Sequence, residues 1–115
     1  KNESGAYVCF DFKERSIQLI CYSIQSGNSS PYQSTLRNWN IQVSNDGNEW
    51  ICVDSQRNKP QLNGNFKIAN FTVRKKLDNF YRFIRLLSTG DSWDKIETKR
   101  FGIHKIEFFG KLSNP

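Results

Sequence analysis

The first of two polar loops with side chains suited to ligand binding is the segment 27–35. Asn28, Tyr32 and Gln33 offer hydrogen-bond donors, acceptors and an aromatic ring, which are the groups that recognition of a sugar or a peptide requires. Loops on a rigid scaffold often carry binding residues. The alternative, which we weigh equally, is a solvated connection whose Tyr32 packs onto the core. The loop is therefore a candidate site.

The second polar loop is the segment 88–102. Trp93 offers a flat stacking face and Asp91 offers an acceptor. Three cations follow in the same loop: Lys95, Lys99 and Arg100. A single loop Trp more often packs its loop onto the core, and exposed basic residues more often form a solvated face. The binding hypothesis stands beside these two structural interpretations.

Nothing in the sequence predicts catalysis, a metal site or a cofactor. His104 is the one histidine, and it opens the last predicted strand. No nucleophile elbow, phosphate loop, zinc-type Cys/His spacing or calcium loop is present in the sequence. A Cys–His pair brought together by the fold is the alternative, and the position of the cysteines in predicted strands disfavours it. We expect a protein that is not an enzyme.

The charge balance admits an acidic ligand without requiring one. The net charge of the 115 residues is +6, and the basic residues are spread along most of the chain. The one basic run, Arg74-Lys75-Lys76, is too short for nucleic acid, which needs a broader stripe interleaved with exposed aromatics. We therefore expect no nucleic-acid partner. No apolar run approaches the ~20 residues of a transmembrane segment.

The three cysteines indicate free thiols. Cys9, Cys21 and Cys52 form an odd set with no close pair, whereas a secreted domain of this size more often carries an even, paired set. All three fall in predicted strands, where Cys often acts as a small buried hydrophobe. The pattern favours an intracellular setting.

Alternation of apolar and polar residues predicts seven strands and little helix. The predicted strands are 6–12, 16–26, 39–44, 50–53, 66–73, 80–87 and 103–112. In the second of these, the apolar parity switches within one run, which predicts either burial on both faces or one bulge. Seven strands separated by polar turns indicate an all-β domain built as a two-sheet antiparallel β-sandwich.

The segment 39–53 predicts a hairpin closed by an Asn-Asp-Gly-Asn turn. A three-residue turn with a bulge would place Ile51 and Val53 on the buried face. A two-residue turn would instead bring Trp50 and Cys52 to it. We favour the bulged register, because it leaves one face wholly apolar.

Arg82 and Arg85 lie within a strongly apolar predicted strand. One interpretation makes them ligands for an anion. We prefer a structural one, in which Arg85 pairs with Asp11 or Glu107, because buried charges require partners. On this hypothesis Glu107→Gln lowers the thermal stability.

Three blocks of the sequence together resemble a known family. Residues 8–12 have an apolar-x-apolar-Asp-apolar pattern, and residues 36–50 combine an aromatic strand with Ser-x-Asp-Gly and a following Trp. Residues 81–86 and 106–110 complete the third block, with an Arg-aromatic-apolar-Arg strand and an Ile-Glu-apolar-Phe-Gly ending. In this order they resemble the discoidin family, also called the F5/8 type C domain, a galactose-binding-like sandwich. Protozoan members are the most similar.

The resemblance implies a jelly-roll-like sandwich of eight strands, without catalysis, that binds ligands through loops clustered at one end. Family members bind glycans, anionic lipid or protein partners. The loop 27–35 corresponds in order to one family binding loop, and 88–102 would lie at the same end. The resemblance therefore implies a carbohydrate-binding module. The alternative is an intracellular protein–protein interaction domain that uses the same loops or a sheet face.

Two departures from the family pattern bear on this expectation. Extracellular family members usually join their ends by a disulfide, and no terminal Cys is present here, so family precedent and cysteine content disagree on the setting. The family also has opening strands and two ligand-touching loops ahead of the block 8–12. We expect residues 1–115 to be a single domain of this type that lacks those opening elements.

Overall fold

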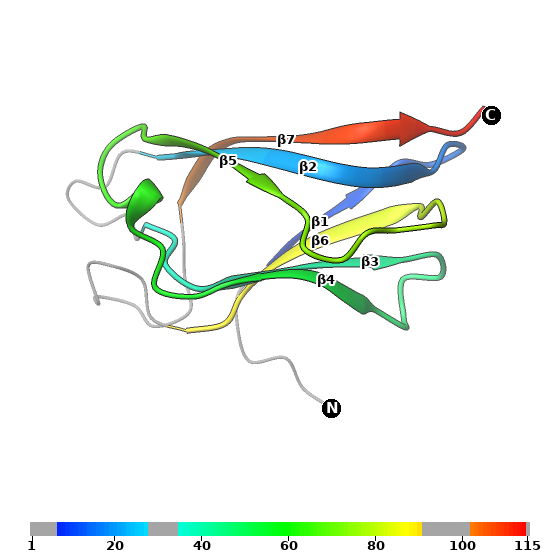
Figure 1. Cartoon of the computed structure of the whole chain (residues 1–115), viewed down its shortest axis with the longest axis horizontal. Helices are drawn as coiled ribbons and strands as arrows, with labels where there is room; N and C mark the ends of the chain where they lie inside the picture. Colours follow the sequence, from blue (N-terminus) through cyan, green and yellow to red (C-terminus); the bar gives the residue numbers. More distant parts are fainter. Residues whose placement is uncertain (1–6, 28–34, 91–101, 115) are drawn as a thin grey trace.

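The computed structural model describes residues 7–27, 35–90 and 102–114. In these residues the chain forms seven β-strands and one short 3-10 turn, η1 (Figure 1). The elements are β1 (Tyr7–Asp11), β2 (Ile17–Ser26), β3 (Trp39–Ser44), β4 (Ile51–Gln56), η1 (Pro60–Leu62), β5 (Ile68–Thr72), β6 (Phe83–Ser88) and β7 (Ile103–Leu112). Each strand that alternation predicts is present; β3 and β7 have the predicted bounds, and the ends of the other five are shifted by up to three residues.

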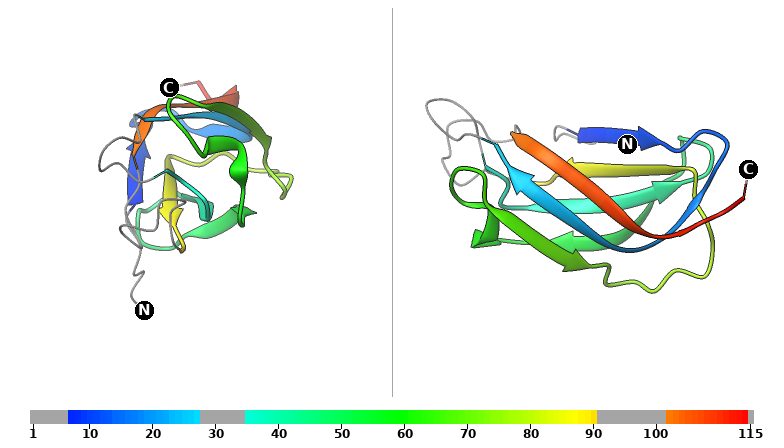
Figure 2. Two further views of the ribbon diagram at one scale, coloured as in Figure 1. Left: turned by 90° about the vertical axis from the view of Figure 1, so that its left-hand side faces the viewer. Right: turned by 90° about the horizontal axis from the view of Figure 1, so that it is seen from above.

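The strands form two antiparallel sheets. Sheet A has the order β1-β6-β3-β4 and sheet B has the order β5-β2-β7. The sheets face each other as two layers (Figures 1 and 2), which confirms the predicted all-β sandwich. The eighth strand implied by the family resemblance is not among the described residues.

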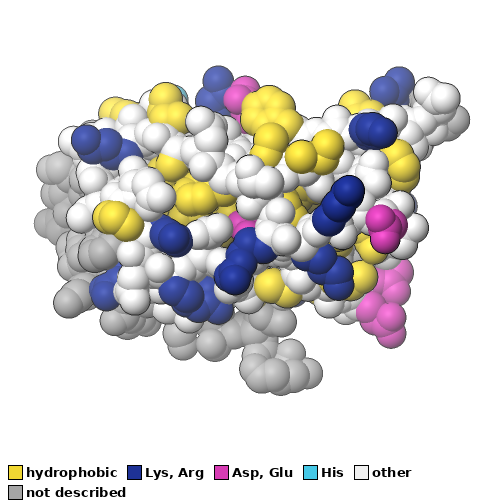
Figure 3. All heavy atoms as spheres, in the orientation of Figure 1, with side chains coloured by type: hydrophobic (Ala, Val, Ile, Leu, Met, Phe, Trp, Pro, Cys, Tyr) yellow, Lys and Arg dark blue, Asp and Glu magenta, His cyan; other side chains and the backbone are white. Residues whose placement is uncertain are grey.

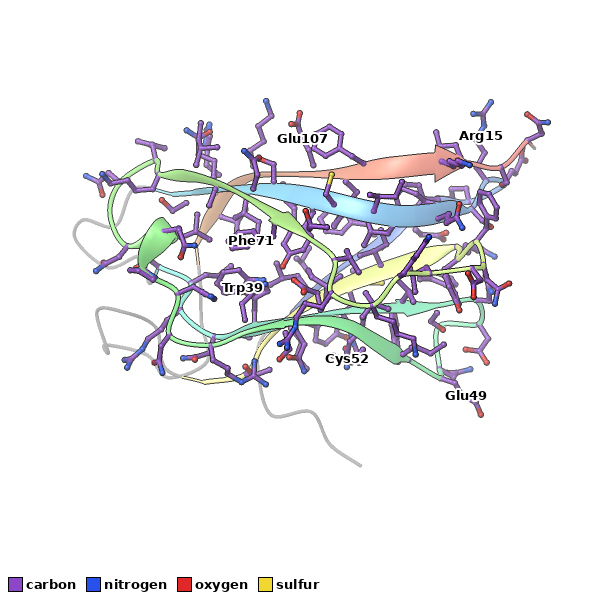
Figure 4. The ribbon with its side chains drawn as sticks, in the orientation of Figure 1. Arg15, Trp39, Glu49, Cys52, Phe71 and Glu107 are labelled. Atoms are coloured by element: carbon purple, nitrogen blue, oxygen red, sulfur yellow. The ribbon has the colours of Figure 1, made fainter. Side chains whose placement is uncertain are left out.

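The core lies between the sheets and is built from the inward-facing residues of both. Its largest fully buried side chains are Trp39 of sheet A and Tyr22 of sheet B. The ring of Phe71, on β5, stacks on Tyr22 and meets Trp39 edge-on, with centroid separations of 5.3 and 5.2 Å. Figure 4 shows Trp39 and Phe71 pointing into the space between the layers. Aromatic contacts thus join the two sheets.

Polar side chains close the connection between β3 and β4, which is longer than the predicted two- or three-residue turn. Ser44 Oγ accepts a hydrogen bond from the backbone N of Gly47 at 2.9 Å. Asp46 Oδ1 accepts from the backbone N of Asn48 at 2.8 Å and of Glu49 at 2.9 Å. Gly47 has a φ of 78°, a conformation that costs glycine little. Side-chain acceptors thus take the place of a tight backbone turn.

The register of this hairpin agrees with the sequence-based prediction only in part. Ile51 pairs with Val43 and a bulge is present, but Ile51 is 40% exposed, so its predicted place on the buried face is wrong. However, the bulge lies inside β4, at Val53, and the next pair joins Ile41 to Asp54. The prediction of a wholly apolar face is therefore wrong, because this face carries the carboxylate of Asp54, which is 2% exposed.

The parity switch in β2 marks a bulge at Ile20. The pairing of β2 with β7 shifts between Leu19 and Cys21, so that Ile20 is left out of the ladder and is 51% exposed. Opposite this bulge the backbones of β2 and β7 come very close. A Cβ added at Gly110 would lie 2.1 Å from the carbonyl oxygen of Gln18. There is no room for a side chain at Gly110, which explains the glycine that ends the Ile-Glu-apolar-Phe-Gly pattern.

The cysteines are free thiols, but they are less buried than the sequence predicts. Cys9 and Cys52 are exposed and Cys21 is partly exposed. The expectation of small buried hydrophobes is thus wrong for Cys9 and Cys52, because alternation in β1 and β4 turns both side chains away from the core.

Asp11 and Glu107 have partners other than Arg85. Arg82 Nε donates to Asp11 Oδ1 at 2.7 Å and its Nη2 donates to Oδ2 at 3.0 Å. These bonds are the main reason why the pKa of Asp11 is lowered to about 2. Glu107 lies on the outer face of sheet B (Figure 4), 3.5 Å from Lys105 Nζ. The predicted pairing of Arg85 is therefore wrong, and Glu107→Gln is not expected to lower the thermal stability.

Arg85 has a structural role through stacking. It is 8% exposed, and its Nε donates to Gln42 Oε1 at 2.8 Å. The guanidinium lies 4.2 Å from the ring centroid of Trp50 and 5.2 Å from that of Tyr7. Weak hydration of the guanidinium and its attraction to ring faces make this position tolerable for a cation.

Candidate functional site

Three connections between the sheets start and finish at one end of the sandwich, which we call the loop end. They are 27–38, 57–67 and 89–102. Ser26 pairs with Ile103 at this end of sheet B. In sheet A, Trp39 pairs with both Gln56 and Ser88. The strand ends in Figures 1 and 2 show the same arrangement, so the fold brings the described ends of both predicted binding loops to one end.

Backbone hydrogen bonds tie the described ends of these connections together. Gly27 N donates to the carbonyl oxygen of Gly102 at 3.4 Å, and Thr89 N donates to that of Asn38 at 3.0 Å. The third connection joins the first at Lys59 N, which donates to the carbonyl oxygen of Arg37 at 3.0 Å. The two predicted loops therefore leave the sheets from adjacent, fixed positions.

The candidate binding residues themselves lie outside the described residues. These are Asn28, Tyr32, Gln33, Asp91, Trp93, Lys95 and Arg100, and Lys99 lies there as well. What the structure places is the pair of anchors on each loop: Gly27 and Thr35 for the first, Gly90 and Gly102 for the second. The site assignment of these side chains stays a prediction.

A polar cluster that the sequence-based prediction missed borders the anchors. Arg37 Nε donates to Asn58 Oδ1 at 2.8 Å, and the backbone N of Asn58 donates to Asn38 Oδ1 at 2.9 Å. Asn58 has a φ of 54°, a left-handed conformation in which Asn is favoured over most residues. The only signal in the sequence was an Asn two residues before Pro60 in a polar loop, which indicates a turn rather than a site.

Arg57 adds a second cation with a defined orientation. Its Nη1 lies within hydrogen-bonding distance of two backbone carbonyl oxygens, at 3.3 Å from that of Trp39 and 3.0 Å from that of Gln56. It also donates to Asn40 Oδ1 at 3.2 Å. Arg57 is exposed, so a planar donor group faces solvent beside the Arg37–Asn58 pair. This part of the loop end can bind acceptors or an anion.

A buried hydrogen-bond network supports the start of β3 behind the cluster. Trp39 Nε1 donates to the Tyr22 hydroxyl at 3.0 Å, and this hydroxyl donates to Asp54 Oδ2 at 2.5 Å. Gln56 Nε2 donates to the same carboxylate oxygen at 3.0 Å. Burial, and then the bond to Asp54, raise the pKa of Tyr22 well above its usual range. The network links the two sheets through buried side chains.

The described residues contain no cluster of three or more His, Cys, Asp or Glu side chains that could hold a metal ion. His104 is exposed on β7, and its ring meets Phe66 edge-on at 5.2 Å. His104 thus lies at the start of the last strand, as the sequence predicts. Among the residues that the structure describes, no helix is long and apolar enough to cross a membrane.

No protein-family profile matches the sequence, and no curated protein is similar to it at a significant level. Solved structures do resemble the fold. A Bacteroides thetaiotaomicron fragment, provisionally assigned as a chitobiase, has a TM-score of 0.67 at 18% identity, over 96% of this chain and 63% of the fragment. The C-terminal domain of a chitobiase from Bacteroides fragilis has a TM-score of 0.65 at 13% identity, over 94% of this chain and 64% of the domain.

The chain thus spans a little less than two thirds of the length of either structure. At these identities the likeness shows the fold alone. It places this chain among β-sandwiches of the kind found as C-terminal domains of chitobiases.

Proposed function

We propose that this protein is a non-catalytic binding module that holds a carbohydrate at the loop end. The observation that carries the proposal is that the described ends of 27–38, 57–67 and 89–102 meet at one end of the sandwich. Convergent loops on a fixed scaffold are the usual place for a recognition site. The polar cluster of Arg37, Asn58 and Arg57 extends this end with oriented donors.

The chemistry of the loop residues favours a sugar. The ring of Trp93, or that of Tyr32, would stack on the apolar face of a pyranose. Asn28, Gln33 and Asp91 would exchange hydrogen bonds with its hydroxyl groups, as planar polar side chains do in ligand sites. Two further residues, Lys95 and Arg100, would add selectivity for acidic sugars. The fold of chitobiase C-terminal domains and the resemblance to discoidin-type sandwiches support the same ligand class.

A glycan array with the intact chain tests the proposal. We expect binding to a defined group of glycans, and we expect Trp93→Ala or Tyr32→Ala to reduce it by about 5- to 150-fold, since stacking on one ring contributes roughly 1–3 kcal/mol by analogy with bases. Phe80→Ala is the matched control, because Phe80 is a partly exposed aromatic (37%) in the connection between β5 and β6. Binding that survives both loop substitutions would exclude these loops, and an array without signal would exclude the glycan.

A protein partner is the second candidate, and one feature favours it. Ile68 is 64% exposed and Phe109 is 47% exposed. Both side chains point to the outer face of sheet B, on the two strands that flank the central strand β2: Ile68 on β5 and Phe109 on β7. If this face binds a protein, Ile68→Asp would abolish capture of that protein, whereas Trp93→Ala would not. The opposite pattern would assign recognition to the loops.

A further inference from the structure

A cavity of about 450 Å³ lies between β2 and the chain that follows β5. Residues 73–77 form one wall, and residues 18–20 of β2 form the other, with Lys111 of β7 beside them. This volume is within the range of small-molecule sites, roughly 300–1,000 Å³. We call this cavity the basic groove.

The groove exists because the chain leaves β2 gradually after β5. Val73 N still donates to the carbonyl oxygen of Ile20, at 2.9 Å. Two residues later Lys75 N donates instead to that of Val53 in sheet A, at 3.0 Å. The segment thus crosses from one sheet to the other. Gln18 Nε2 then donates to the carbonyl oxygen of Leu77 at 2.8 Å and fixes the far end of the crossing.

Four cations and no acidic residue line the groove. They are Arg74, Lys75, Lys76 and Lys111. Among the described residues, Lys75, Lys76 and Lys111 form neither an ion pair nor a side-chain hydrogen bond. Figure 3 shows Lys and Arg side chains over the centre and right of the face on which the chain after β5 runs, and further ones at its left. Cations that converge without counter-charges favour an anionic occupant.

The inner surface of the groove is apolar. Leu19, Val73 and Leu77 are buried core residues that reach its lining, and Ile20, displaced by the bulge, adds an exposed side chain. A small inorganic ion would leave this surface in contact with water. A ligand that combines an anionic group with an apolar body would satisfy both parts of the lining.

We propose that the basic groove binds a small amphiphilic anion, meaning a sulfonate, sulfate, phosphate or carboxylate group attached to an aromatic or short aliphatic body. The lysines hold the anionic group at the rim, and the body packs against Leu19, Ile20 and Leu77. Nucleic acid fits less well, because the groove is short and offers no aromatic face for a base.

This site is separate from the loop end and does not depend on the function proposed there. Gln18 and Lys111 are paired near the start of β2, whereas the loop end lies past Ser26, at the other end of the same strand. An amphiphilic anion in the groove would therefore leave 27–38 and 89–102 untouched. Failure of either proposal leaves the other intact.

The test titrates the intact chain with naphthalenesulfonate as the probe. Isotope-edited NMR and calorimetry measure the binding at constant ionic strength. We expect saturable binding that shifts the signals of 18–20, 72–77 and 111. Sodium sulfate supplies the charge without the body, and naphthalenemethanol supplies the body without the charge. Each should bind at least about tenfold more weakly, because the two parts of the lining contribute separately.

Charge reversal in the groove provides the second readout. Lys75→Glu and Lys111→Glu should each weaken naphthalenesulfonate binding by about tenfold or more. Lys67→Glu changes the net charge equally, but Lys67 is an exposed residue just before β5 and does not line the groove. It should leave binding unchanged. Unchanged melting temperatures show that the variants are folded.

Three results would overturn the proposal. Equal loss in Lys67→Glu and in the groove variants would indicate an effect of net charge alone. Sulfate that binds as tightly as naphthalenesulfonate would reduce the groove to a counter-ion site. Binding to anionic lipid vesicles or to an acidic peptide, without binding of the small probe, would assign the basic face to a macromolecular partner instead.

Discussion

Tyr22 of sheet B donates a hydrogen bond to the buried carboxylate of Asp54 in sheet A, with an O–O distance of 2.5 Å. Asp54 is 2% exposed, and Arg74 N donates to its second carboxylate oxygen at 3.2 Å. A buried charge of this kind is tolerated only when its oxygens are paired. The Tyr22–Asp54 hydrogen bond therefore joins the two sheets, and its loss would leave a buried carboxylate oxygen without this partner.

Tyr22→Phe should lower the free energy of unfolding by about 1–3 kcal/mol, since it leaves a buried carboxylate and the indole N–H of Trp39 each short of a partner. Urea denaturation measures the loss. Tyr81→Phe is the control, because among the described residues the Tyr81 hydroxyl makes no hydrogen bond and its side chain is only partly buried. Equal stability losses in the two variants would contradict the role of the Tyr22–Asp54 pair.

The same tyrosine predicts a pH dependence at the alkaline end. The pKa of Tyr22 is raised in the folded state, first by burial and then by Asp54, so folding favours the protonated hydroxyl. Its contribution is complete below the unfolded pKa of about 10 and is lost as pH rises toward the higher folded value. The free energy of unfolding should fall more steeply above that pH in the native sequence than in Tyr22→Phe. Parallel curves would show that Tyr22 does not carry the effect.

Arg82→Gln should return the pKa of Asp11 from about 2 toward its ordinary value of 3.8, because the bonds from Arg82 are the main reason why it is lowered. The stabilisation from this pair is present above the unfolded pKa and is lost as pH falls through about 2. NMR titration of the Asp11 carboxyl carbon measures the change. Arg15→Gln, which removes an exposed cation after β1, should leave the titration where it is; a shift of equal size there would point to net charge.

Arg85→Lys should destabilise the protein by about 1 kcal/mol or more, since an ammonium group cannot stack between two rings or keep the planar bond to Gln42. Denaturation followed by tryptophan fluorescence also reports on Trp50, whose ring lies 4.2 Å from the guanidinium. Arg15→Lys is the matched exposed control. If both substitutions had the same small effect, stacking would not contribute to stability.

Gly110→Ala should cost about 1–3 kcal/mol or more, because the added methyl group meets backbone rather than a movable side chain. Its nearest neighbour would be the carbonyl oxygen of Gln18, at 2.1 Å. Gly90→Ala is milder, since its Cβ would lie 3.2 Å from the side-chain Nδ2 of Asn38. Thermal melts of the two variants give the comparison, and a smaller loss at Gly110 than at Gly90 would refute the close approach of β2 and β7.

Most of the fold could be predicted from the sequence, because alternation is a local signal. Trp39, Ile41 and Val43 each face the core within one strand, and the period-2 pattern is enough to show it. The parity switch in β2 also predicted a bulge, which the structure locates at Ile20. The hairpin and a bulge in it were predicted. The bulge lies at Val53 of β4 rather than at the turn, and the turn is longer than predicted because Ser44 and Asp46 close it through side chains.

The candidate site could be predicted only to the level of its loops. The sequence indicated 27–35 and 88–102 as binding loops, and the strand topology brings their anchors together. Arg37 and Asn58 were missed, since their hydrogen bond joins residues from two different connections. No periodic pattern reports such a contact.

The sequence by itself determined which residues alternate, and so the number of strands and the sandwich class. The tertiary structure alone decided which side chains meet across those strands. Asp11 meets Arg82 rather than Arg85 because of the register between β1 and β6, and Lys111 joins Lys75 because β7 returns beside β2. The physical reason is that strand periodicity acts between neighbours in the chain, whereas register and charge clustering depend on contacts between distant segments.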